Sequence, residues 1–111
     1  MTFEEYQRAA RRTQNTDLTG HARKLHALHG LAGEVGEIHG LFQKVYQGHS
    51  MDYDALRHEI GDLLWFVAEL CDVCRWEMGD VASENIEKLR RRYPDGFSAA
   101  RSVNRTNEAE Q

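Results

Sequence analysis

The sequence has few of the residues that break helices, build disulfide frameworks or span membranes. Its 111 residues include one proline, Pro94, and two cysteines. One late proline leaves helical periodicity uninterrupted along most of the chain, and two cysteines cannot form a disulfide scaffold. No apolar run approaches the ~20 residues that a membrane span needs. These absences favour a helical protein of the reducing cytoplasm, with no membrane partner.

Basic charge is also scarce. Lys and Arg together number 14 against 18 Asp and Glu, which gives a net charge of -4. Without a basic field, no stable nucleic-acid partner is expected. The first residues are acidic and amphipathic, unlike a secretory signal. The acidic excess falls entirely between Glu34 and Asp62, where six acids face two bases, so the charge of this segment needs an explanation.

The remaining composition is that of one small globular domain. Apolar residues make up 41% of the chain and charged residues 29%, an ordinary balance for a folded protein. No alternating strand pattern, internal repeat or low-complexity block is present. We therefore predict an all-α fold, with a single domain over residues 1–97 and a flexible C-terminal tail over 98–111.

Apolar residues spaced by three and four positions predict four helices. The expected helices span about 3–13, 22–47 and 53–78, with a fourth that runs from an Asp80 cap to Tyr93-Pro94. Thr2 and Glu5 form a capping box at the first helix. Ser50 or Asp52 is expected to cap the third helix, and Gly79 to end it.

Two long antiparallel helices dominate this four-helix, bundle-like prediction. So short a bundle leaves apolar surface uncovered, so we expect a homo-dimer or homo-tetramer. The first long helix carries four glycines on one side: Gly30, Gly33, Gly36 and Gly40. Because glycine destabilises a helix interior, these positions need a reason. Close helix packing is the favoured one, and the approach of a ligand or a partner helix is a compatible alternative.

Each long helix carries two acids three residues apart. On a helical wheel Glu34 and Glu59 fall inside the apolar arcs, while Glu37 and Asp62 lie just past their edges. Such pairs usually belong to a solvated face, but a carboxylate in an apolar interface is costly without compensation. Antiparallel packing would bring four carboxylates together. This pattern therefore predicts a site for a hard divalent cation.

The acid pairs also carry a family resemblance. Glu34-Val-Gly-Glu37 and Glu59-Ile-Gly-Asp62 resemble the E-x-x-E … E-x-x-D signature of MazG-like nucleoside triphosphate pyrophosphohydrolases. The similarity covers about residues 22–98 and includes Asn85-Ile-Glu-Lys88-Leu-Arg-Arg-Arg92-Tyr93-Pro94. Gly33 departs from the pattern, because many members have a further glutamate there. The resemblance implies Mg²⁺-dependent (or Mn²⁺-dependent) hydrolysis of a nucleoside triphosphate to a monophosphate and pyrophosphate, in nucleotide-pool cleaning.

The same resemblance implies roles for individual residues. It assigns metal binding and catalysis to the four acids, with Glu34 or Glu37 as the general base. It assigns substrate binding to four residues: Asn85, Lys88, Arg92 and Tyr93. Lys44 is added as a fifth, because it falls on the same side of its helix as Glu37. The face shared by Asn85, Lys88 and Arg92 suits a polyphosphate, although a solvated basic face is the common alternative. A phosphate contact and a salt bridge are both open for Lys44. No base-specificity pocket is assigned.

Other functions remain open at this point. The C-x-x-C pattern of Cys71 and Cys74 suggests redox chemistry or zinc, but its place inside a helix favours buried free cysteines. One alternative is a zinc site that includes His26 and His29, and another is a di-iron carboxylate bundle. A third is a non-enzymatic helical interaction module. Neither acid pair has the Glu-x-x-His pattern of di-iron sites.

Overall fold

The computed structural model describes residues 1–105 of the chain, and the regular elements in this range are helices. They are α1 (Phe3–Ala10), the 3₁₀ helix η1 (Arg11–Thr13), α2 (Gly20–Tyr46), α3 (Tyr53–Val73), α4 (Met78–Arg92) and α5 (Ala99–Val103). Within these residues the β-type pairing is an isolated bridge between Pro94 and Gly96. The all-α prediction is therefore confirmed. The chain divides into two compact units, one from Met1 to Met78 and one from Gly79 onward, and each is described by itself.

The predicted helix starts agree with the observed caps at two places. At α1 the Glu5 amide donates to Thr2 Oγ1 over 3.1 Å, and the Thr2 amide donates to Glu5 Oε1 over 3.3 Å. At α3 the Ala55 amide donates to Asp52 Oδ1 over 2.9 Å. Asp52, rather than Ser50, is thus the cap of α3. These side chains satisfy amides that a helix start otherwise leaves without a partner.

The third helix ends earlier than predicted. The helix stops at Val73 instead of near residue 78, because Arg75 adopts a left-handed backbone with φ of 61°. The Arg75 amide donates to the Asp72 carbonyl over 3.0 Å, and the Trp76 amide donates to the Cys71 carbonyl over 2.8 Å. These two bonds form a Schellman motif, the common ending that usually places glycine where Arg75 stands.

Two further expectations change with this ending. Gly79 does not end α3, and α4 begins at Met78, so Asp80 lies in the first turn of α4 rather than at its cap. A carboxylate in the first turn still interacts favourably with the helix dipole.

A fifth helix, α5, occupies part of the expected tail, with the Ser98 hydroxyl accepting from the Arg101 amide. Residues 106–111 lie outside the described residues, and flexibility of the tail stays a prediction.

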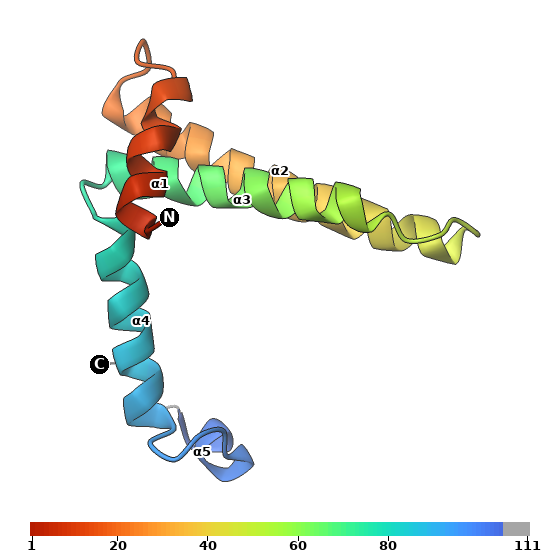
Figure 1. Ribbon diagram of the computed structural model, residues 1–111, viewed down its shortest axis with the longest axis vertical. Coiled ribbons are helices and arrows are strands. Elements are labelled where there is room, and N and C mark those ends of the chain that lie inside the picture. Colours follow the sequence, from red (N-terminus) through yellow and green to blue (C-terminus); the bar gives the residue numbers. More distant parts are fainter. Residues whose placement is uncertain (106–111) are drawn as a thin grey trace. The chain divides into compact units, whose positions relative to one another are not determined.

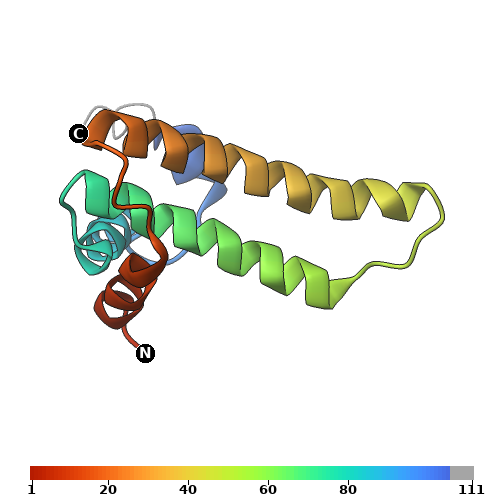
Figure 2. The same ribbon diagram turned by 90° about the horizontal axis from the view of Figure 1, so that it is seen from above.

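In the first unit, α2 and α3 run side by side in opposite directions, and α1 lies against α3 (Figures 1 and 2). His26 of α2 contacts the fully buried Glu69 of α3, with 2.6 Å between His26 Nδ1 and Glu69 Oε1. The close-packing interpretation is confirmed at Gly30, where an added Cβ would overlap the Phe66 ring. Within the single chain it is not observed at the other three glycines of that side, because an added Cβ there meets nothing within 4 Å. The approach of a ligand or a partner helix to these three stays a prediction.

The core of the first unit lies where α1 packs against the C-terminal half of α3. Its buried residues are Ala10, Ala68, Cys71 and Met78, and the partly buried Tyr6, Leu64, Trp65 and Val67 pack against them. Gln7 is fully buried beside this core and makes three hydrogen bonds. Its Nε2 donates to Asp72 Oδ1 over 2.8 Å and to the Trp76 carbonyl over 2.9 Å, and its Oε1 accepts from the Met78 amide over 2.8 Å. Gln7 therefore ties α1 to the end of α3.

Much of the apolar surface of the helical hairpin remains uncovered in a single chain. Exposed apolar side chains on α2 and α3 include Leu25, Leu28, Val35, Phe42, Val45 and Ile60. Several of these belong to the apolar spacing that predicted the two helices. Across residues 1–105, no helix has both the length and the apolar character required to cross a membrane.

Candidate active site

The helical hairpin brings three of the four predicted acids together. Glu34 from α2 and Glu59 and Asp62 from α3 each place a carboxylate oxygen within 4.8 Å of the other two. We call these three residues the acidic cluster. In the described part of the chain, no other group of three or more acids, histidines or cysteines has this geometry. Glu34 and Glu59 are half-buried and Asp62 is exposed, as their positions on the helical wheel predict.

The carboxyl group of Glu34 is strongly perturbed by its neighbours. The pKa of Glu34 is raised from 4.5 to about 7, chiefly by a hydrogen bond with Glu59 and also by burial and the nearby negative charges. Glu34 Oε2 is buried and has no hydrogen-bond partner among the described residues. The cluster therefore holds repelling carboxylates and an oxygen without a donor, both of which a cation would relieve.

The fourth acid, Glu37, stands apart from the other three. It is exposed and lies outside the acidic cluster, three residues after Glu34 on α2. It remains close enough for its charge to contribute to the raised pKa of Glu34. The two acids on α2 are therefore not equivalent: Glu34 points into the cluster, and Glu37 lies beside it with its carboxylate in solvent.

A cavity of about 320 Å³ adjoins the cluster. It is lined by Thr13, Glu34, Asp62, Trp65 and Phe66. Trp65 Nε1 donates to Thr13 Oγ1 over 2.8 Å, and the Trp65 and Phe66 rings meet edge to face with 5.1 Å between their centroids. An aromatic wall beside carboxylates suits a ligand that has both a flat ring and negatively charged groups balanced by a cation.

Sequence reasoning missed this cavity. Trp65 lies one turn after Asp62 on α3, and that spacing could have suggested it. Thr13 and Phe66 gave no signal, because they reach the cluster only through packing between elements distant in the sequence. Tyr6 of α1 is a further neighbour: burial raises the pKa of its phenol, and the negative charge of Asp62 adds to this rise.

The predicted substrate-binding residues of α4 belong to the unit that begins at Gly79. Asn85, Lys88 and Arg92 follow one another at three and four residues, and so share a helix face as predicted. The Tyr93 ring lies against that of Phe97, with centroids 5.6 Å apart. Arg90 is exposed and pairs with Glu87 over 2.9 Å. The structure describes this unit by itself, and phosphate binding by these residues stays a prediction.

Lys44 lies near the C-terminal end of α2 with its side chain exposed. It forms no ion pair among the described residues, so the salt-bridge alternative is not observed. A phosphate contact by Lys44 stays a prediction.

A family model describes this combination of helices and acids. The model for the MazG nucleotide pyrophosphohydrolase domain matches residues 23–97, about two thirds of the chain. The chain belongs to the MazG family. No curated protein and no solved structure gives a further match. MazG domains are nucleotide pyrophosphohydrolases and generally depend on a metal ion, so the chain is assigned to a metal-dependent family of hydrolases that act on nucleotides.

The acidic cluster fits the metal ion of a MazG protein. Its donors are all carboxylate oxygens, the ligands that Mg²⁺ and Mn²⁺ prefer. The buried, unpartnered Glu34 Oε2 gives independent support, because a cation would compensate a buried carboxylate oxygen that has no donor. Glu34, Glu59 and Asp62 would hold the ion, and Glu37 is the nearest further carboxylate on α2.

The competing metal sites do not form in the described residues. Cys71 is buried and Cys74 half-buried, and both are free. Burial is the largest cause of a raised pKa at the Cys71 thiol, with the charges of Asp72 and Cys74 adding to it. A raised pKa disfavours the thiolate that redox chemistry and zinc binding need. His26 is engaged with Glu69, and no histidine joins the acidic cluster as a di-iron site would require.

Proposed function

We propose that this MazG protein hydrolyses a nucleoside triphosphate to a nucleoside monophosphate and pyrophosphate, with Mg²⁺ or Mn²⁺ as cofactor. The observation that carries the proposal is the convergence of Glu34, Glu59 and Asp62 beside a cavity with an aromatic wall. The acids supply the ligands that a metal–triphosphate complex needs, and the wall supplies a surface for its base or sugar. Cleaning of the nucleotide pool in the cytoplasm is the role proposed for this reaction.

The residues around the cavity have separate tasks in this reaction. A bound divalent cation would neutralise phosphate charge and polarise water. Glu34, Glu59 and Asp62 hold it, which leaves Glu37 free to act as the general base. Glu37 takes a proton from a water molecule whose oxygen attacks the α-phosphorus. The bond from that phosphorus to the α–β bridging oxygen breaks, and the electron pair leaves with pyrophosphate.

The choice of Glu37 over Glu34 as general base follows from their surroundings. Glu34 is half-buried within the cluster and shares a hydrogen bond with Glu59, so its oxygens are directed to metal binding. Glu37 is exposed and not constrained by such a contact. A base must reach water and release its proton to solvent after each turnover, which an exposed carboxylate does readily.

Residues of α4 are proposed as further contacts of the substrate. Lys88 and Arg92 would stabilise the negative charge that builds on the departing pyrophosphate, and Asn85 would orient a phosphate or sugar oxygen. Lys44 and Tyr93 are proposed as further substrate contacts. For Asn85, Lys88 and Arg92 this proposal rests on their spacing along α4 and on the family assignment. Lys44 lies on α2 and Tyr93 directly after α4.

Self-association belongs to the same proposal. The exposed apolar side chains of α2 and α3 are numerous for so small a chain, and a second copy would bury them. We expect a dimer or tetramer by light scattering. Phe42→Asp, at a half-exposed apolar position of α2, should shift the protein toward the monomer. A wild-type monomer at micromolar concentration would contradict this expectation.

The reaction is tested with a panel of standard and modified nucleoside triphosphates in the presence of Mg²⁺. The expected products are monophosphate and pyrophosphate from at least one substrate. Orthophosphate release would show a different reaction, and no turnover with any substrate would favour the non-enzymatic interaction module. Glu59→Gln should lose both turnover and Mn²⁺ binding, and Glu84→Gln, which changes an exposed acid outside the cluster, should lose neither.

Metal binding and proton transfer can be separated by one further variant. Glu37→Gln should lower kcat by ~100-fold or more, because a general base contributes about that much, while Mn²⁺ still binds. Calorimetric titration with Mn²⁺ measures the binding in each variant. Full activity of Glu37→Gln would exclude Glu37 as the base. Strong Mn²⁺ binding by an inactive Glu59→Gln protein would exclude Glu59 as a ligand.

A further inference from the structure

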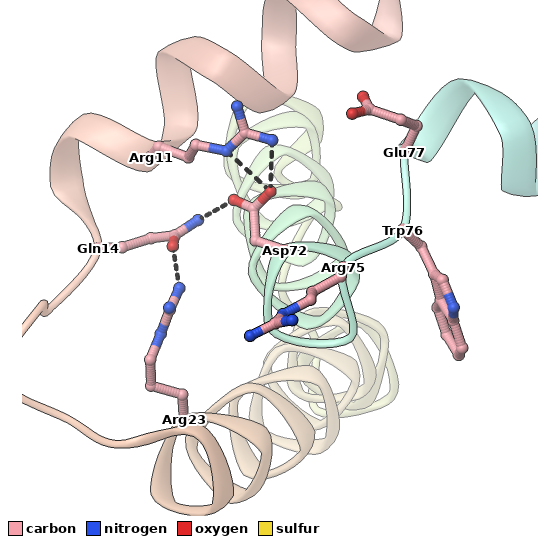
Figure 3. A pocket seen from close by; sticks show the side chains of 7 residues that line it. All are labelled: Arg11, Gln14, Arg23, Asp72, Arg75, Trp76 and Glu77. Atoms are coloured by element: carbon pink, nitrogen blue, oxygen red, sulfur yellow. Dashed lines mark hydrogen bonds and ion pairs between the residues drawn. The ribbon is translucent and has the colours of Figure 1, made fainter.

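A second cavity, unlike the first in its chemistry, lies at the end of α3. Its volume is about 380 Å³, near the lower end of the range for small-ligand pockets. Arg11, Gln14, Arg23, Asp72 and Arg75 contribute to its lining (Figure 3). All of these residues belong to the first unit of the chain. Asp72 and the exposed Glu77 are the acids of this lining, so three guanidinium groups face two carboxylates.

The one acid at the centre of this group is already saturated. Asp72 Oδ1 accepts from Gln7 Nε2 over 2.8 Å and from Arg11 Nε over 2.9 Å, and Arg11 Nη2 also lies 2.9 Å from this oxygen. Asp72 Oδ2 accepts from Gln14 Nε2 over 2.7 Å. The charge of Asp72 is therefore balanced by Arg11, and its oxygens have little capacity for another cation.

Arg23 and Arg75 are left without a balancing charge. Arg23 Nη2 donates to the neutral Gln14 amide oxygen, and Arg23 Nε is buried without an acceptor among the described residues. The Arg75 side chain forms no hydrogen bond or ion pair with the described part of the chain. Figure 3 shows the Arg75 guanidinium on the same side of Asp72 as Arg23, while Glu77 lies on the Arg11 side.

The backbone at Arg75 adds a second and independent observation. Arg75 occupies the left-handed position of the Schellman motif, where glycine is preferred because a Cβ is unfavourable. An arginine at this position makes the fold less stable than glycine would. The Arg75 side chain is exposed and lines the cavity, so its guanidinium group is available to a ligand there.

We infer that this cavity binds a phosphate-type oxyanion, held chiefly by Arg23 and Arg75. Guanidinium groups recognise phosphate oxygens through paired, charge-assisted hydrogen bonds. The anion would supply both the missing negative charge and acceptors for the donors of the two arginines. Inorganic phosphate, pyrophosphate and the phosphate group of a nucleotide share this chemistry.

The site is distinct from the acidic cluster. Along α3, ten residues separate Asp72 from Asp62, which corresponds to about 15 Å of helix. Along α2, eleven residues separate Arg23 from Glu34, a similar distance. No metal ion is needed at this second site, because its own side chains carry the positive charge. Oxyanion binding there is therefore separable from metal-dependent binding at the cluster.

The test is a calorimetric titration of the full chain with inorganic phosphate, in the presence of EDTA and at constant ionic strength set with chloride. We expect saturable binding to the wild type and equally to Glu59→Gln. Parallel titrations with pyrophosphate and a nucleoside monophosphate identify the preferred source of the oxyanion. If one of the three anions binds more tightly than the others, and Arg75→Gly weakens that binding, the site is supported and that anion is its preferred ligand.

Arg75→Gly is the decisive variant, because its effects on binding and stability go in opposite directions. It should raise the midpoint of thermal unfolding, since glycine suits the left-handed backbone. It should also weaken phosphate binding by at least about tenfold, the loss expected for a charge-assisted contact. Arg12→Gln is the matched control: Arg12 is an exposed arginine beside Arg11 that does not line the cavity, and phosphate should bind this variant as it binds the wild type.

Three results would overturn the inference. The metal-free wild type could show no saturable binding of phosphate or of the other two probes. Arg75→Gly could bind phosphate as tightly as the wild type does. Arg12→Gln could lose as much affinity as Arg75→Gly, which would indicate nonspecific charge attraction. In each case Arg11 and Gln14 would serve only to hold the end of η1 against Asp72 of α3, and Arg75 would be an ordinary exposed arginine.

Discussion

Gly30 and Gly36 stand on the same helix in different surroundings, and this contrast gives a sharp test of the packing. An added Cβ at Gly30 would overlap the Phe66 ring of α3, whereas one at Gly36 meets nothing within 4 Å. Replacing each glycine with alanine should therefore change the free energy of unfolding in opposite directions, although the chemical change is identical.

The expected magnitudes follow from two effects. Alanine favours a helix interior over glycine by about 1 kcal/mol, so Gly36→Ala should be more stable than the wild type by roughly that amount. At Gly30 the same gain is opposed by displacement of Phe66, and overpacking of this kind costs about 1–3 kcal/mol. Gly30→Ala should thus lie about 1–3 kcal/mol below Gly36→Ala. Because Phe66 lines the cavity beside the acidic cluster, Gly30→Ala should also have lower turnover.

The assay is urea unfolding followed by circular dichroism, at the same protein concentration for all variants. Equal unfolding free energies for Gly30→Ala and Gly36→Ala would refute the packing argument. A loss of stability in Gly36→Ala would have a different meaning. It would place another molecule, such as a second copy of the chain, against the open side of α2.

Three further predictions concern single side chains. Mn²⁺ affinity should be weaker near pH 6 than near pH 8, because a proton on Glu34, with its pKa of about 7, competes with the cation; calorimetry that gives equal affinities would contradict this. Gln7→Leu should lower the free energy of unfolding by about 2–4 kcal/mol, since three hydrogen bonds are lost around a buried side chain, and a urea titration measures it. His26→Ala leaves the buried Glu69 without its partner and should cost about 2–4 kcal/mol in the same assay; an unchanged midpoint would show that the pair is dispensable.

The long helices could be predicted because their apolar spacing persists over many turns and their starts carry explicit caps. Thr2 with Glu5, and Asp52, mark two starts by side-chain chemistry that is local in sequence. The end of α3 had no such mark. The apolar spacing continues through Cys74 and Met78, and an arginine at the left-handed position gives no warning of a turn.

The candidate site also has a part that could be predicted from local sequence and a part that could not. The acids could be predicted from spacing alone, since a wheel separates the inward Glu34 and Glu59 from the outward Glu37 and Asp62. The cavity next to them could not, because Thr13 arrives from a different element and Phe66 is positioned by its packing on Gly30. Contacts of that kind are set by tertiary structure, and a single sequence carries no local pattern for them.

The carboxylates proposed to bind a metal ion should destabilise the metal-free fold, and this effect can be measured. The raised pKa of Glu34 means that its protonated form is favoured in the folded state. The stability that this form contributes is fully present below the unfolded pKa of about 4.5 and is lost as the pH rises through about 7. With EDTA present, the wild type should therefore be less stable near pH 8 than near pH 5.

Glu59→Gln removes the carboxylate that interacts most strongly with Glu34. It should therefore make the metal-free protein more stable than the wild type near pH 8. Without the charge of Glu59, the metal-free variant should gain about 1 kcal/mol near pH 8, a modest value because solvent screens this half-exposed site. The same variant should gain no stability from added Mn²⁺, whereas the wild type gains more with each increase in concentration. Urea unfolding near pH 5 and near pH 8, with EDTA or with Mn²⁺, measures the free energy of unfolding of both proteins under each condition. If the metal-free variant is less stable than the wild type near pH 8, the three carboxylates do not repel one another as their geometry requires, and the case for a cation among them fails.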